Sequence, residues 1–163
     1  MLLSSNRIRF TTTRPEDLDR VLALERDQYN SRYVFRWSRE QHQGAMDAID
    51  FLHITIKTSA GIIGYMILHT DSINRVVEFK RLVIGPKGQG YGREAVELLK
   101  QLAFEKLNCH RLWLDVYTDN VPAISLYLDL GFVQEGLLRD CQTTAHGYRS
   151  MLVMSMLEYE YNK

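Results

Sequence analysis

The stretch GPKGQGYGREA, residues 85–95, decides how this sequence is interpreted. Four of its first eight residues are glycine, and the helix-forming run REAVELLKQLAFEKL follows without a break. Glycine weakens both helices and strands. The free N–H groups and the dipole at a helix N-terminus attract anions, and missing Cβ atoms let a phosphate approach the backbone. The pattern therefore predicts a phosphate-binding turn, with a purely structural turn as the alternative.

Two common phosphate-binding motifs do not fit this turn. The pattern GxxxxGK[ST] is absent, and GxGxxG fails because Arg93 stands where the third glycine is required after Gly88 and Gly90. A nucleotide- or phosphosugar-binding α/β protein with an unusual glycine turn remains an open alternative at this point.

Length and composition predict one domain, residues 1–163. The 20 basic and 20 acidic residues give a net charge of zero, so no overall field favours nucleic acid or a membrane as partner. The sequence has no apolar run of about 20 residues and no signal-peptide pattern. Two cysteines without CxxC spacing favour free thiols, and five histidines without metal-ligand spacing predict no metal. We expect a cytoplasmic protein.

The hydrophobic pattern predicts an α/β chain in the order β-α-α-β-β-β-α-β-α-β-β. One helix begins around Pro15, a second covers 38–48, a third runs from the glycines to about Leu107, and a fourth has Asp119 or Asn120 as its N-cap. The expected strands are 7–13, 51–58, 61–70, 75–84, 111–117, about 132–141 and 148–157. Together they predict a mixed sheet with helices packed on it.

Two motifs, in this order, resemble those of the GCN5-related N-acetyltransferase (GNAT) superfamily. Residues 87–92, KGQGYG, match the pattern Q/R-x-x-G-x-G/A with Lys87 in the first position. The segment NVPAISLYLDLGFVQEG from Asn120 is similar to the family's second hallmark, an Asn, a helix with Leu-Tyr and then Gly-Phe. The branch it resembles holds ribosomal-protein alanine and spermidine acetyltransferases.

The resemblance implies an α/β (α+β) GNAT fold and transfer of an acetyl group from acetyl-CoA to an amine in a ternary complex. The expected sheet is mixed but mostly antiparallel, with about six or seven strands, helices on both faces and a V-shaped splay between two central parallel strands. A domain that binds acetyl-CoA as a sensor or structural subunit, without transfer, is the alternative function. The acceptor is left open between a small-molecule amine and a protein N-terminus, and a homodimer is left open as well.

The resemblance also implies the acetyl-CoA site. The strand before the glycines would bond the pantetheine arm through its backbone, the turn would bind the pyrophosphate, and Asn120 would bond the pantetheine from the other side. The positions carried over for the strand and the turn are Leu82, Val83, Ile84, Lys87, Gly88, Gln89, Gly90, Tyr91, Gly92 and Arg93.

Amine acetylation needs two groups that handle protons. An alkyl amine of pKa about 10.4 is neutral in only about one molecule in a few thousand at pH 7, so a general base is useful. Glu78 is the expected base, with an ion pair to Lys80 as its alternative role and Asp115 as a weaker candidate. Tyr127 is the expected acid for the leaving thiolate, because a phenol is protonated at neutral pH; a core tyrosine is its alternative.

The segment RDQYNSRYVFRWSRE, residues 26–40, joins the first two helices, where the resemblance places the acceptor pocket. Glu25 or Glu40 would hold a cationic amine there, and simple packing of the two helices is the alternative. The expected lining residues are Tyr29, Tyr33, Phe35 and Trp37.

Overall fold

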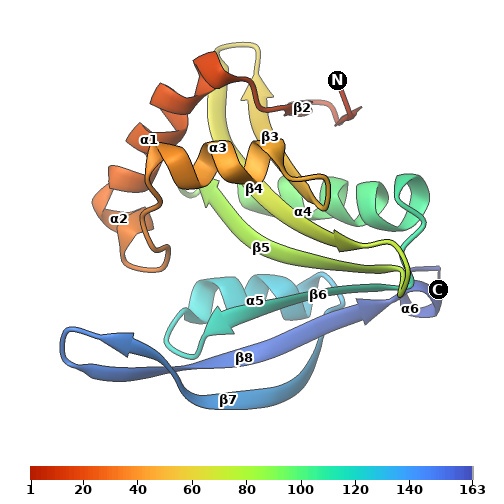
Figure 1. Ribbon diagram of the computed structural model, residues 1–163. Coiled ribbons are helices and arrows are strands. Elements are labelled where there is room, and N and C mark those ends of the chain that lie inside the picture. Colours follow the sequence, from red (N-terminus) through yellow and green to blue (C-terminus); the bar gives the residue numbers. More distant parts are fainter. Residues whose placement is uncertain (163) are drawn as a thin grey trace.

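The computed structural model describes residues 1–162, which contain one eight-stranded sheet (Figure 1). The strand order is β1-β2-β3-β4-β5-β6-β8-β7, and every neighbouring pair is antiparallel except β5 and β6. The expectation of a mixed, mostly antiparallel sheet is confirmed, with one strand more than expected. The strands are β1 (Leu3–Ser4), β2 (Arg9–Thr12), β3 (Phe51–Thr58), β4 (Gly61–Asp71), β5 (Val76–Ile84), β6 (Arg111–Tyr117), β7 (Val133–Thr144) and β8 (Gly147–Leu157).

Helices cover both faces of the sheet, as expected. In Figure 1, α1 and α3 lie on one face of the sheet, while α4 and α5 lie on the other, with α5 behind β6. The Ser38 hydroxyl accepts from the Gln41 N–H and the Gln41 side chain accepts from the Ser38 N–H, a capping box that begins α3. The helices are α1 (Leu18–Arg26), α2 (Gln28–Ser31), α3 (Arg39–Asp47), α4 (Tyr91–Gln101), α5 (Val121–Asp129) and α6 (Glu158–Tyr161), with a 3₁₀ turn at Pro15–Asp17 and a π turn at Leu102–Lys106.

Two apolar clusters hold the helices to the sheet. On one face, Val21 and Leu24 of α1 share a buried cluster with Tyr65, Ile67 and Val83 of β4 and β5. On the other face, a larger cluster joins α4 and α5 to side chains from six strands. Burial on both faces of β4 and β5 fixes the register of the central strands.

The strands β5 and β6 separate partway along their length. Their parallel pairing covers only three positions and ends at Glu78 opposite Trp113. Just beyond, the register between β4 and β5 shifts so that Lys80 has no partner on β4, and such a bulge bends a strand. The expected V-shaped splay between β5 and β6 is therefore confirmed (Figure 1), and the end of the pairing places Glu78 at its closed end.

No helix within residues 1–162 is long and apolar enough to cross a membrane.

Candidate active site

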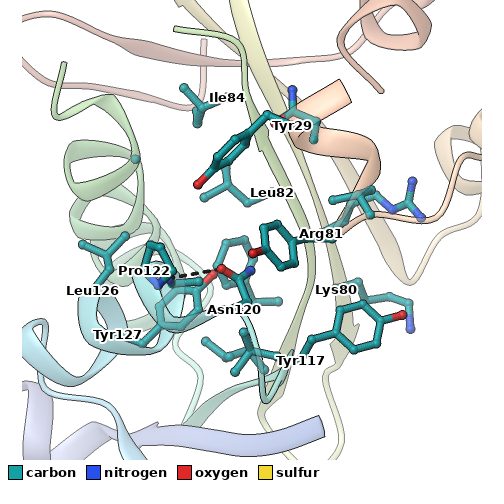
Figure 2. A pocket seen from close by; sticks show the side chains of 18 of the residues that line it. Tyr29, Lys80, Arg81, Leu82, Ile84, Tyr117, Asn120, Pro122, Leu126 and Tyr127 are labelled. Atoms are coloured by element: carbon teal, nitrogen blue, oxygen red, sulfur yellow. Dashed lines mark hydrogen bonds between the residues drawn. The ribbon is translucent and has the colours of Figure 1, made fainter. Parts of the chain in front are cut away.

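The splay opens into a cavity of about 590 Å³. Its walls come from β5, from the glycine turn and the start of α4, from β6, from α5 and from the segment after α2. Gln142 of β7 and Met151 of β8 also line it. Figure 2 shows Leu82 and Ile84 of β5 facing the same space as Asn120 and Tyr127. The cavity therefore joins the two motifs that the sequence holds apart.

The glycine turn presents bare backbone to this cavity. Gly88 and Gly90 have φ of 69° and 80°, in the left-handed region that glycine adopts without strain. Gly90 is the N-cap of α4 and offers no side chain to the first N–H groups of the helix. A Cβ atom on Gly88 would meet no atom within 4 Å, so the turn is open. Free N–H groups, a helix dipole and open space together fit a phosphate group.

Lys87 lies in the glycine turn, lines the cavity and contacts α2. Its Nζ donates to the Asn30 Oδ1 atom at 2.5 Å and lies 4.7 Å from the centre of the Tyr29 ring. Burial lowers the pKa of Lys87, and the charge of Asp27 partly opposes this shift. The lysine thus fixes α2 beside the turn and brings a positive charge to the same end of the cavity.

Most of the predicted acetyl-CoA residues line the cavity: Leu82, Ile84, Lys87, Gly88, Gly90, Tyr91, Gly92 and Asn120. Three do not. The Val83 side chain is in the α1 cluster, the Gln89 carbonyl accepts from Arg7 at 3.0 Å, and Arg93 pairs with Asp129 at 2.9 Å. The side chains of Val83 and Arg93 are therefore engaged outside the cavity.

Asn120 caps α5 and also faces the cavity. Its Oδ1 accepts from the Ala123 N–H at 3.4 Å, the dashed line in Figure 2. Its Nδ2 donates to no protein group among the described residues, so this amide can bond a ligand carbonyl.

Tyr127 combines a buried ring with an accessible hydroxyl. The ring packs edge-on against Phe79 and Phe132, with centroids 6.2 and 5.7 Å away. Within residues 1–162 the Tyr127 hydroxyl has no hydrogen-bond partner. Every fully buried side-chain oxygen among these residues does have a partner. The hydroxyl oxygen must therefore lie at the surface of the cavity that Tyr127 lines. Burial raises the pKa of Tyr127, which keeps the hydroxyl protonated.

Two carboxylates lie near the closed end of the splay. Glu78 accepts from Lys80 Nζ at 3.0 Å, and its Oε2 is 3.7 Å from Nδ1 of His69, its cross-strand partner on β4. The Asp115 carboxylate on β6 makes no hydrogen bond or ion pair with another described residue, although its own backbone N–H is close enough to stabilise the charge. Burial and the charge of Glu78 raise the pKa of Asp115, while Lys80 opposes the shift. The Lys80 ion pair is thus present, and both candidate bases line the cavity.

The segment after α1 forms one wall, and the four predicted aromatic residues all line the cavity: Tyr29, Tyr33, Phe35 and Trp37. The prediction for the acidic residues is wrong. Glu40 is exposed and does not line the cavity. Glu25 is 1% exposed, and its carboxylate accepts from the Trp37 N–H, the Tyr65 hydroxyl and Arg81. Glu25 is therefore buried against protein donors and does not line the cavity, so its carboxylate does not face an acceptor amine.

A buried chain of hydrogen bonds continues from Glu25 away from the cavity. His42 Nε2 lies 3.0 Å from Glu25 Oε1, His53 Nε2 lies 2.9 Å from His42 Nδ1, and Thr13 Oγ1 lies 2.8 Å from His53 Nδ1. Sequence reasoning missed this network because it tested the histidines only for metal spacing. No group of three potential metal ligands occurs among residues 1–162.

This network makes the fold sensitive to acid. Burial and the charge of His42 lower the pKa of His53 to about 3, although Glu25 opposes the shift. Since an unfolded histidine has a pKa near 6.5, the unfolded chain binds the proton first, and stability falls as pH drops below that value. We expect the free energy of unfolding to fall by about 2 kcal/mol between pH 7 and 5 through this group. Urea unfolding across that range measures it.

His53→Gln is the matched variant for this prediction. It should be less stable than the parent at pH 7 and show a flatter dependence between pH 7 and 5. An equally steep fall in the variant would assign the acid sensitivity to another group.

Comparisons with known proteins agree with this geometry. The family model described as "Acetyltransferase (GNAT) domain" matches residues 7–133. The spermidine N(1)-acetyltransferase of Escherichia coli K12 is 26% identical, over 97% of this chain and 90% of that enzyme. The Vibrio cholerae serotype O1 enzyme of the same name is 30% identical, over 58% of this chain and about half of its own length, 56%.

A solved structure shows the same fold. The crystal structure of spermidine N-acetyltransferase from Vibrio cholerae, in complex with CoA and spermine, superposes with a TM-score of 0.88 at 22% identity. The match covers 98% of this chain and 100% of that one. The family model spans the glycine turn and the second motif from Asn120 through Phe132, and the splayed sheet is in place; this chain belongs to the GNAT acetyltransferase family.

Proposed function

We propose that this protein is an acetyl-CoA-dependent N-acetyltransferase that acetylates a primary amine in a ternary complex. One observation carries the proposal: a single cavity joins the uncapped start of α4, the free hydroxyl of Tyr127 and the carboxylates of Glu78 and Asp115. The spermidine acetyltransferases among its relatives support an amine as acceptor.

The chain's own groups fit the successive parts of acetyl-CoA. The N–H groups of the turn from Gly88 to Gly92 suit the pyrophosphate. Beyond Glu78, the edge of β5 that faces β6 has no strand partner among the described residues, so its backbone can pair with pantetheine amides. Asn120 offers its Nδ2 from the opposite wall.

Bound acetyl-CoA supplies an activated acetyl group, which the amine attacks at the thioester carbon while the CoA thiolate leaves. We assign the acid role to Tyr127, whose hydroxyl gives its proton to the departing sulfur. We assign the base role to Glu78, which takes a proton from the amine directly or through water. Lys80 and His69 beside Glu78 hold its carboxylate at the closed end of the splay.

Glu78→Gln tests the base. At pH 7 the rate constant should fall by about 10²-fold, the size expected for a lost general base. The deficit should shrink as pH rises, because the amine then loses its proton to solvent without help. The pH–rate profiles of parent and variant, with saturating acetyl-CoA, measure this. Parallel profiles would move the base to Asp115 or to an ordered water.

Glu16→Gln is the matched control for that measurement. It makes the same chemical change on an exposed carboxylate outside the cavity, which pairs with Arg14. Its profile should follow that of the parent.

The function as a whole is tested by binding and then by turnover. Melting curves with acetyl-CoA, ATP and NAD, each added separately, should show a shift for acetyl-CoA alone; a ligand at 100 times its Kd stabilises by about 2.7 kcal/mol. A panel of amines with acetyl-CoA, read as CoA release, should then show turnover. A shift without turnover on any amine would favour the sensor alternative, and a shift with ATP or NAD would favour a nucleotide-binding protein.

We also propose that residues 1–163 form one domain, that the protein is a homodimer and that it lies in the cytoplasm. The cysteines Cys109 and Cys141 are both free, which supports a reducing compartment.

A further inference from the structure

We call the part of the cavity lined by Glu78, Lys80, Arg81 and Asp115 the acceptor end. It holds little unbalanced negative charge. Glu78 already pairs with Lys80 at 3.0 Å, and the charge of Arg81 in the same wall is balanced by buried Glu25 at 2.6 Å. Among the described residues that line the cavity, Asp115 is the one carboxylate that makes no hydrogen bond or ion pair with another residue. The cavity can therefore balance one positive charge from a ligand, whereas further charges would lie near Lys80 and Arg81 without a counterion.

The rest of this end is aromatic. Tyr33, Phe35 and Trp37 line it from the segment after α2, and Tyr117 lines it from the end of β6. Figure 2 shows Tyr117 on the opposite side of the view from Tyr127. The Phe35 and Tyr117 rings meet edge to face, with centroids 6.4 Å apart. Such a wall favours an apolar or aromatic body.

A bridge across the splay limits the size of this end. Arg149 of β8 lies over the Tyr117 ring, 3.5 Å from its centre, and pairs with Asp119 at 2.6 Å. The same guanidinium donates to the Arg32 carbonyl at the end of α2, at 3.3 Å. Together with the Phe35–Tyr117 contact, this joins the helical side of the cavity to β6 and β8. A small molecule fits behind such a bridge more readily than the end of a folded protein chain.

We propose that the acceptor is a compact primary amine that carries a single positive charge on an aromatic or apolar body. Its ammonium group binds Asp115 and its body packs against Trp37, Phe35 and Tyr117. This inference rests on the proposed function and narrows it: the polycationic acceptors named for the relatives would be poor ligands here.

A matched set of amines tests the proposal. With saturating acetyl-CoA, 2-phenylethylamine should have a kcat/KM at least about 10-fold above that of spermidine and that of a tripeptide with a free α-amine, a difference of about 1.4 kcal/mol. A preference for spermidine or for the tripeptide overturns the inference and leaves the N-acetyltransferase function intact. Failure of the protein to bind acetyl-CoA would instead overturn the proposed function.

The affinities of the two amines test the same proposal without requiring acetyl transfer. In calorimetry on the protein saturated with CoA, 2-phenylethylamine should bind more tightly than spermidine at moderate ionic strength. Tighter binding of spermidine overturns the proposal even if no amine is acetylated.

Asp115→Asn tests the anchor itself. It removes the charge and keeps the shape, so KM for 2-phenylethylamine should rise by about 10-fold while the acetyl-CoA dissociation constant stays within about twofold. Glu16→Gln, an equal change outside the cavity, should leave KM unaltered. An unchanged KM in Asp115→Asn overturns the anchoring role, and so does a loss of kcat alone that recovers at high pH, because that pattern belongs to a general base.

Discussion

Gly90→Asp is expected to abolish acetyl-CoA binding while the fold persists. Gly90 is the N-cap of α4, and its missing side chain leaves the first N–H groups of the helix free. Aspartate is a strong N-cap residue, so its carboxylate would occupy those N–H groups and repel a pyrophosphate at the same time. The φ of 80° adds strain, although Asp tolerates the left-handed region better than most residues. Calorimetry should find affinity weakened by at least about 100-fold, equivalent to about 2.8 kcal/mol.

Two further variants separate a specific loss of acetyl-CoA affinity from a general loss of folding. Gly90→Ala adds only a Cβ atom, which would lie 3.3 Å from the Arg7 guanidinium, so it should weaken binding less than Asp does. Gly61→Asp places the same residue at another positive φ, 121°, at the first residue of β4, where an added Cβ would meet no atom within 4 Å. It should leave affinity unchanged. Equal affinity of Gly90→Asp and the parent would remove the glycine turn from the acetyl-CoA site.

The sequence was most informative where a feature is local. The β3–β4 hairpin, β6 and the helix after the glycines follow from residue patterns a few positions long. β1 was missed because two residues carry no periodicity, and it forms only by pairing with β2. The helix expected to reach Leu107 ends as a π turn at Leu102–Lys106 instead. That change depends on tertiary packing, which a helical pattern does not record.

The candidate site likewise contains residues that short motifs predict and residues that only the tertiary structure brings together. The glycine turn and Tyr127 lie in short motifs, whereas His69 meets Glu78 only through the register of β4 with β5. The burial of Glu25 could have been predicted from its position in the helical pattern. With Leu18 and Val21 it follows a spacing of three and four residues, which places it on the buried stripe of α1. A carboxylate on an apolar stripe indicates a satisfied internal anion.

Tyr127→Phe is expected to separate an enzyme from a binding protein. The change removes one hydroxyl that has no partner within residues 1–162, so the edge-on contacts with Phe79 and Phe132 should persist. Stability should change by less than about 0.5 kcal/mol, as for a substitution that breaks no protein contact. If the hydroxyl protonates the leaving thiolate, kcat should fall by about 10²–10³-fold, or about 2.7–4 kcal/mol of transition-state stabilisation. Stopped assays on an accepted amine give kcat, and calorimetry gives the acetyl-CoA dissociation constant.

The outcome depends on separating rate from affinity. A dissociation constant within about threefold of the parent, with the loss in kcat, supports the acid role, because an interaction made only in the transition state affects rate and not binding. Because burial raises the pKa of Tyr127, the parent should show no loss of rate from this group at mildly alkaline pH. Tyr148→Phe removes the hydroxyl of an exposed tyrosine outside the cavity and should match the parent in both measurements. Normal turnover in Tyr127→Phe would make this tyrosine a packing residue, and loss of acetyl-CoA binding would place its hydroxyl in recognition; in either case the proton for the leaving sulfur must come from another group.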